Sequence, residues 1–176
     1  MAGSGSSDLY AAAQEFLVGC WNALADTPDG SPSCYYISPG PPAWDMCPCL
    51  IVHASGPQQA DTFPLVPALA PGHRPNVQGL VNLVTLTATI LRCIPTVGEN
   101  GELPDPTDVE AAAQQTYADL WAVHNHIVRG KRNGTIFPPD TREMLVDPAV
   151  SVVTQGGCGG WQYTIRVQLD GYVPGP

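Results

Sequence analysis

The end of the chain shows a strict alternation of large apolar and polar residues over positions 161–170. The apolar set is Trp161, Tyr163, Ile165, Val167 and Leu169, and the polar set is Gln162, Thr164, Arg166, Gln168 and Asp170. A period of two residues is typical of a strand with one buried and one solvated face. We therefore expect a terminal strand whose polar face forms part of the molecular surface, lines a lumen or contacts a neighbouring subunit. These five polar residues are the candidate contact site.

Two other segments show apolar residues at three- and four-residue spacing, which is typical of amphipathic helices. The first follows a cap at Ser7 or Asp8 and ends before the turn at 26–30. The second begins with the capping box Thr107-Asp-Val-Glu110 and ends near a glycine cap at Gly130 or Gly134. Its expected core stripe is Val109, Ala112, Ala113, Thr116, Leu120, Val123 and Ile127.

Short apolar or β-branched runs predict the remaining strands. They lie at 34–37, 49–54 and 80–94, and a closing hairpin joins 149–154 to 161–170. In the long run, Val84, Leu86, Ala88 and Ile90 share one face, and threonines share the other with Val81, Leu83 and Leu91. The order of elements predicts an α+β fold, with a mostly antiparallel sheet of about four to five strands and two main helices packed on one side.

The same pattern predicts one domain. We expect a flexible N-terminal arm at 1–7, a single domain at 8–172 with long loops at 55–79 and 95–106, and a loose tail at 173–176. The arm has neither the basic nor the apolar region of a signal peptide. We therefore expect a protein made in a reducing cytoplasm, whose six cysteines are mostly free thiols.

The composition favours a protein that assembles with other subunits. Charged residues make up only 13% of the chain, so much of its surface must be neutral or apolar, as is common where subunits cover one another. The net charge of −9 argues against a protein that grips nucleic acid in a basic groove. No apolar run reaches the roughly 18 residues that span a bilayer.

Several residues suggest chemistry, but their spacing does not support it. His124 and His126 are two positions apart on a helix and point in different directions, so they cannot share one metal ion. The thiols of Cys47-Pro-Cys49 are too close in sequence for a zinc knuckle. The run Gly156–Gly160 precedes a strand rather than a helix, which favours a flexible turn over a phosphate loop or a turn carrying a Cys158 nucleophile. We expect no catalytic, cofactor-binding or metal-binding residues, and no enzyme.

Five segments in order along the chain together suggest a family. They are Ala11–Phe16, Ser38–Pro42, Thr85–Pro95 with Arg92-Cys93 near its end, Glu110–Trp121, and Gly156–Trp161 continuing into Arg166–Tyr172. This pattern resembles the tail terminators and head–tail neck proteins of long-tailed phages that infect actinobacteria. The resemblance implies a hexameric ring that caps the tail tube and joins it to the head-closure or connector proteins, with DNA passing through the lumen without specific binding. It also implies assembly in the host cytoplasm and a place in the virion, at the neck or the top of the tail.

Three alternatives remain open at this point. A head-closure or adaptor protein of the same neck would differ only in its partners. A minor virion binding module would be a monomer that binds a ligand or a host protein. A metal-dependent enzyme would contain stoichiometric zinc, although the histidine and cysteine spacing argues against it.

Overall fold

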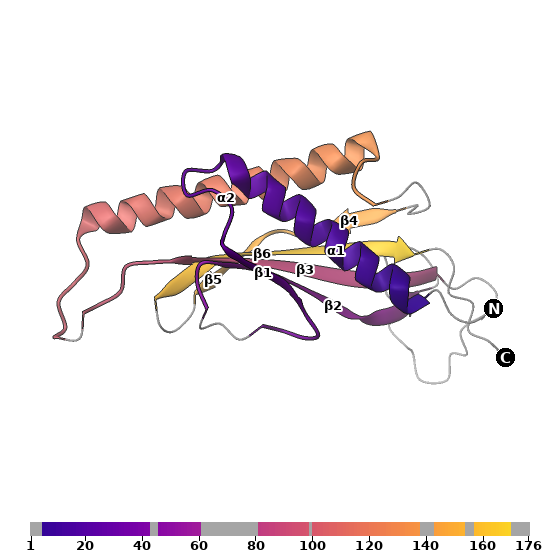
Figure 1. Ribbon diagram of the computed structural model, residues 1–176, viewed down its shortest axis with the longest axis horizontal. Coiled ribbons are helices and arrows are strands. Elements are labelled where there is room, and N and C mark those ends of the chain that lie inside the picture. The colour runs from indigo at the N-terminus through magenta and orange to yellow at the C-terminus, as the bar shows by residue number, and fades with distance from the viewer. Residues whose placement is uncertain are drawn as a thin grey trace.

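A computed structural model describes residues 5–42, 46–60, 81–98, 100–137, 143–153 and 157–169. The helices are α1 (Gly5–Ala23), the short 3-10 helix η1 (Leu24–Asp26) and α2 (Pro106–Asn133). The strands are β1 (Cys34–Ser38), β2 (Cys49–Ala60), β3 (Val81–Cys93), β4 (Met144–Val146), β5 (Val150–Val153) and β6 (Cys158–Leu169). The α+β fold with two main helices on one side of the sheet is confirmed (Figure 1).

In the described part of the chain, the sheet has six strands: the order is β1-β2-β3-β6-β4, and β5 also pairs with β6. Its antiparallel centre is the long β2–β3–β6 array, while β1 runs parallel to β2. The sequence pattern did not predict β4, because three residues are too few to show a period. The expected hairpin near the C-terminus is present as β5 and β6.

The core lies between the sheet and the helices. From β3 it takes Val84, Leu86, Ala88 and Ile90, as the alternation predicts, and α1 contributes Phe16, Leu17 and Cys20. On the opposite face, a smaller cluster of Cys49, Ile51 and Leu91 packs with parts of β1 and β5. Both faces of β2 and β3 are therefore covered at this end of the sheet.

Several predicted boundaries were wrong. α1 begins at Gly5, inside the predicted arm 1–7, because extending a helix that is already nucleated costs little even for small polar residues. β2 extends to Ala60, into the predicted loop 55–79, because β3 offers it a partner as far as Val81; a bulge lies between Ser55 and Gln58. Residues 61–79 of that loop lie outside the described residues, as do 1–4 of the arm and the tail 173–176.

The start of α2 also differs from the capping-box prediction. Asp105 is the N-cap: its carboxylate accepts a hydrogen bond from the Thr107 backbone N–H at 2.8 Å, and Pro106 is the first helical residue. A proline suits this position because it has no N–H to leave unsatisfied. Gly134 is the C-cap, with a left-handed φ of 63°.

Most of the predicted core stripe of α2 is confirmed, because Val123 and Ile127 are buried and Leu120 packs against the core, but its first residue and two polar positions differ. Val109 is 45% exposed, whereas the polar residues Gln115 and Asp119 are buried. Gln115 and Asp119 are buried because Arg92 reaches from β3 under the helix and makes a polar centre there. Apolar periodicity alone could not anticipate a buried ion pair.

The glycine run before β6 is partly strand rather than a flexible turn. β6 begins at Cys158, and a Cβ on Gly160 would lie 1.9 Å from the carbonyl oxygen of Ile90 on the paired strand. Gly157 has a φ of 81° and accepts a hydrogen bond from the backbone N–H of Ile94 at 2.7 Å. Glycine is needed here for close approach of the two backbones.

Candidate functional site

The polar residues predicted on the terminal strand share the sheet face that points away from the helices. Gln162, Thr164, Arg166 and Gln168 alternate along β6 with residues of the main core, and each is partly buried. Asp170, the fifth residue of the predicted site, lies outside the described residues. The structure therefore places four of the five candidates on one surface.

The paired strand β3 continues this face with a row of threonines, of which Thr87 and Thr89 are buried, with 6% and 0% of their area exposed. In the register of β3 and β6, Thr89 lies opposite Gln162 and Thr87 opposite Thr164. Gln162 Nε2 donates to Thr89 Oγ1 at 3.3 Å, and the hydroxyls of Thr87 and Thr164 are 3.4 Å apart. We call the set Thr85, Thr87, Thr89, Gln162, Thr164, Arg166 and Gln168 the polar sheet face.

Arg166 is the only arginine or lysine on the polar sheet face, and its charge is partly matched within the chain. Its Nη2 lies 3.1 Å from Asp147 Oδ2, and the two side chains are 36% and 26% exposed. Such a partly solvated pair contributes little to stability. The partly exposed β6 side of the face therefore carries mainly neutral hydroxyl and amide groups.

His53 of β2 borders the same face, opposite Thr87. It is only 8% exposed, and its Nδ1 has no hydrogen-bond partner among the described residues. Burial lowers the pKa of His53, so the ring is neutral at pH 7. No sequence pattern pointed to His53, because it stands in an apolar strand segment without a recognisable partner.

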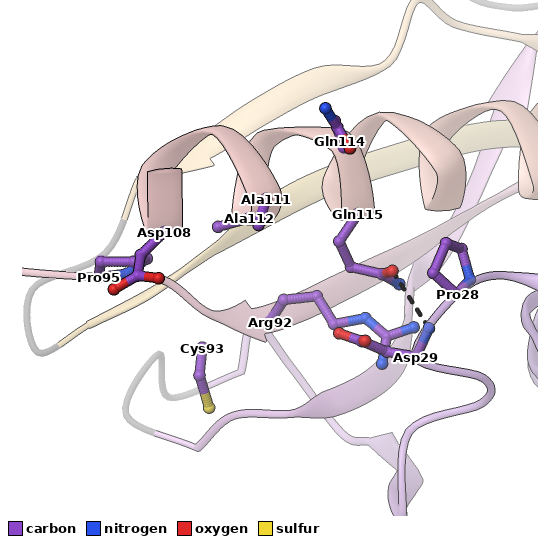
Figure 2. A pocket seen from close by; sticks show the side chains of 10 residues that line it. All are labelled: Pro28, Asp29, Arg92, Cys93, Pro95, Asp108, Ala111, Ala112, Gln114 and Gln115. Atoms are coloured by element: carbon purple, nitrogen blue, oxygen red, sulfur yellow. Dashed lines mark hydrogen bonds between the residues drawn. The ribbon is translucent and has the colours of Figure 1, made fainter. Parts of the chain in front are cut away.

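A cavity of about 430 Å³ opens on the other side of the sheet, beside the first turns of α2 (Figure 2). Its lining comes from the turn after η1, the end of β3 and α2: Pro28, Asp29, Arg92, Cys93, Pro95, Asp108, Ala111, Ala112, Gln114 and Gln115. The backbone N–H of Asp29 donates to Gln115 Oε1 at 3.2 Å, which ties the turn to the helix.

Arg92 anchors the wall of this cavity. Its guanidinium donates to both oxygens of Asp119, at 2.7 and 3.0 Å, and to the carbonyl oxygen of Gly30 at 2.7 Å. Gln115 Nε2 adds a further hydrogen bond to Asp119 Oδ1 at 3.0 Å. The ion pair is buried and bidentate, so it fixes the end of β3 under α2 rather than presenting a free cation to a ligand.

The cysteines differ from the prediction of mostly free thiols. Four of the six form disulfides, Cys34–Cys49 and Cys47–Cys158, while Cys20 is buried and free and Cys93 is exposed and free. The first bond joins residues opposite each other on β1 and β2. The second joins segments 111 residues apart in sequence, and only the tertiary fold reveals that they are adjacent.

The histidines of α2 are separated as the helical spacing predicts. His124 packs edge-on against Trp121, whereas His126 lies against Gly19 of α1. Burial lowers the pKa of His126. Among the described residues, no group of three or more histidine, cysteine, aspartate or glutamate side chains could hold a metal ion.

Comparison with known proteins adds no relative to this description. No protein-family model matches the chain, and no curated protein matches its sequence. Neither helix in the described part of the chain is both long enough and apolar enough to cross a membrane.

Proposed function

We propose that this chain is a structural phage protein, a tail terminator whose copies form a ring that caps the tail tube and joins it to the head connector. The observation that carries the proposal is the polar sheet face, a row of mainly neutral hydroxyl and amide groups on β3 and β6 whose β6 members are partly exposed. The resemblance of five ordered segments to neck proteins gives the family context. In this proposal, the protein acts in the virion, at the neck or the top of the tail.

Neutral polar groups suit either of two positions in a ring. At a subunit boundary, hydroxyl and amide groups cost less to desolvate than charges and can hydrogen-bond across the contact. In a lumen, they hold water and do not bind phosphates as arginine and lysine do, so DNA passes without being held. The net charge of −9 favours the same behaviour.

A closed ring also requires a second, different contact surface, because each subunit meets its two neighbours through unlike faces. Two exposed aromatic side chains of α2, four residues apart, supply a candidate: Trp121 is 61% exposed, and Tyr117 is 56% exposed although its ring also packs against Trp161 of β6. Exposed aromatic side chains are enriched where proteins bind one another. The polar sheet face and this aromatic pair lie on opposite sides of the sheet.

The first test is the native mass of the purified protein over a concentration series, with negative-stain images of the heaviest species. A six-fold ring with an open centre supports the tail terminator. A twelve-fold ring favours a head-closure or adaptor protein of the same neck. A chain that stays monomeric, even when purified tail tubes are added, contradicts the proposal and favours the binding-module alternative.

A pair of variants then tests the polar sheet face itself. Thr164→Arg puts a bulky cation in the centre of the face, and Gln14→Arg makes a matching change at an exposed position of α1. If the face is a subunit boundary, only Thr164→Arg breaks the ring. If it lines the lumen, the ring of that variant persists and gains salt-sensitive DNA binding. Equal behaviour of the two variants refutes a role for this face.

A further inference from the structure

Three sulfur atoms gather where β3 ends and β6 begins. Cys47 and Cys158 share a disulfide, and the thiol of Cys93 donates to Cys47 Sγ at an S···S distance of 3.4 Å. Cys93 and Cys158 are also directly opposite each other in the register of β3 and β6. Figure 2 shows the sulfur of Cys93 pointing away from α2 and the cavity's polar centre. A free thiol therefore lies in contact with a disulfide.

We propose that these cysteines form a thiol–disulfide exchange site. The thiolate of Cys93 attacks Cys47 Sγ, a Cys47–Cys93 bond forms, and the Cys47–Cys158 bond breaks. Cys158 leaves as a thiolate and takes up, through solvent, the proton that Cys93 released. One disulfide and one thiol are present before and after, so the step needs no external oxidant or reductant.

The geometry and exposure assign the roles. A separation of 3.4 Å falls within the roughly 3–3.5 Å of reacting atoms that are ready to combine. Cys93 is exposed, so water can stabilise the thiolate that must attack. Cys20, the other free thiol, is fully buried, and burial raises its pKa far above the usual range, so it stays protonated and unreactive.

Exchange would change which thiol faces the solvent. In the structure the free thiol is the exposed Cys93, whereas Cys158 is only 1% exposed. After exchange, the free thiol would be the buried one, and a buried thiol is inert. The segment around Cys47 stays tethered to the sheet in both forms. The site would thus switch between a form that reacts with small disulfides, such as oxidised glutathione, and a form that does not, whether or not the protein forms a ring.

Two variants test whether Cys47 can form a disulfide with either partner. In Cys158→Ala, Cys93 is the partner that remains in the cluster for Cys47. In Cys93→Ala, Cys158 is the partner that remains. Each folded variant is reduced, reoxidised with oxidised glutathione, quenched in acid, alkylated and mapped by mass spectrometry without reduction. We expect Cys47–Cys93 to form in the first variant with a yield and rate comparable to those of Cys47–Cys158 in the second. Far-UV circular dichroism checks folding, and Cys158→Ser replaces the alanine variant if it unfolds.

The wild-type protein then shows whether exchange occurs. Samples held at mildly alkaline pH are quenched over time and mapped in the same way. We expect the Cys47–Cys93 peptide to appear while Cys93 alkylation falls and Cys158 alkylation under denaturing conditions rises by the same amount. The proposal is overturned if Cys93 in the Cys158 variant yields only glutathione adducts, or if wild-type Cys47 pairs with Cys158 alone at every time.

Discussion

Replacing Arg92 by leucine should be among the most damaging single changes in this protein. Asp119 is 1% exposed and accepts hydrogen bonds from Arg92 Nε, Arg92 Nη2 and Gln115 Nε2. The substitution removes two of these three donors and the only positive charge that the structure shows paired with the carboxylate. Leaving one partner of a buried pair uncompensated costs about 3–5 kcal/mol. In a chain of this length, that corresponds to a fall in Tm of roughly 10 °C.

The assay is urea unfolding followed by tryptophan fluorescence, with the single and double variants compared in one thermodynamic cycle. Arg92→Leu and Asp119→Leu should each lower the free energy of unfolding by about 3–5 kcal/mol, and the double variant should recover most of that loss. Arg166→Leu is the matched control: its pair with Asp147 is partly solvated, so the loss should stay below about 1 kcal/mol. If Arg92→Leu costs no more than Arg166→Leu, or the two core losses simply add, the reasoning about the buried pair is wrong.

Three further predictions concern the sheet, pH and the shorter disulfide. Gly160→Ala should cost about 3 kcal/mol or more, because its Cβ would lie 1.9 Å from a backbone oxygen, whereas Gly40→Ala, with open space around it, should change urea stability little. Burial lowers the pKa of His126, so the unfolded state takes up a proton on this ring first, and stability should fall as pH drops below about 6.5. In a series of thermal melts at different pH, His126→Gln should make that fall in stability shallower. An unchanged slope would contradict this prediction. Replacing Cys34 and Cys49 together by alanine removes a disulfide between residues 15 apart in sequence. The free energy of unfolding should fall by about 3 kcal/mol in the oxidised protein but by much less after reduction. Equal losses in both states would rule out the disulfide as the cause.

Local patterns predicted those parts of the fold in which a regular alternation of apolar and polar residues extends over many positions. The alternation over 161–170 identified β6 and the face on which Gln162 and Thr164 lie. The long run at 80–94 identified β3 and its core-facing side. These predictions succeed because a strand of this length must place alternate side chains on opposite faces wherever it packs.

Contacts between segments that are distant in sequence could not be predicted, because no local sequence pattern indicates them. From the sequence alone, Asp119 is expected to be a surface residue of a helix. In the fold, β3 places Arg92 beneath it, and the two side chains form a buried ion pair. Three-residue β4 is set by pairing with β6 rather than by its own pattern. Apolar periodicity placed Val109 in the core, but in the first turn of α2 that side chain is 45% exposed.

By itself, the sequence determined an α+β fold, the two helices, the long strands and a polar face on the terminal strand, because these follow from the periodicity of neighbouring residues. The tertiary structure alone decided the disulfide partners, the buried ion pair and the cluster of three sulfurs. Cys47, Cys93 and Cys158 meet only because the register of β3 against β6 places Cys93 opposite Cys158 and the segment before β2 reaches the same end of the sheet. Such contacts depend on strand order and register, which pairings across the whole chain determine.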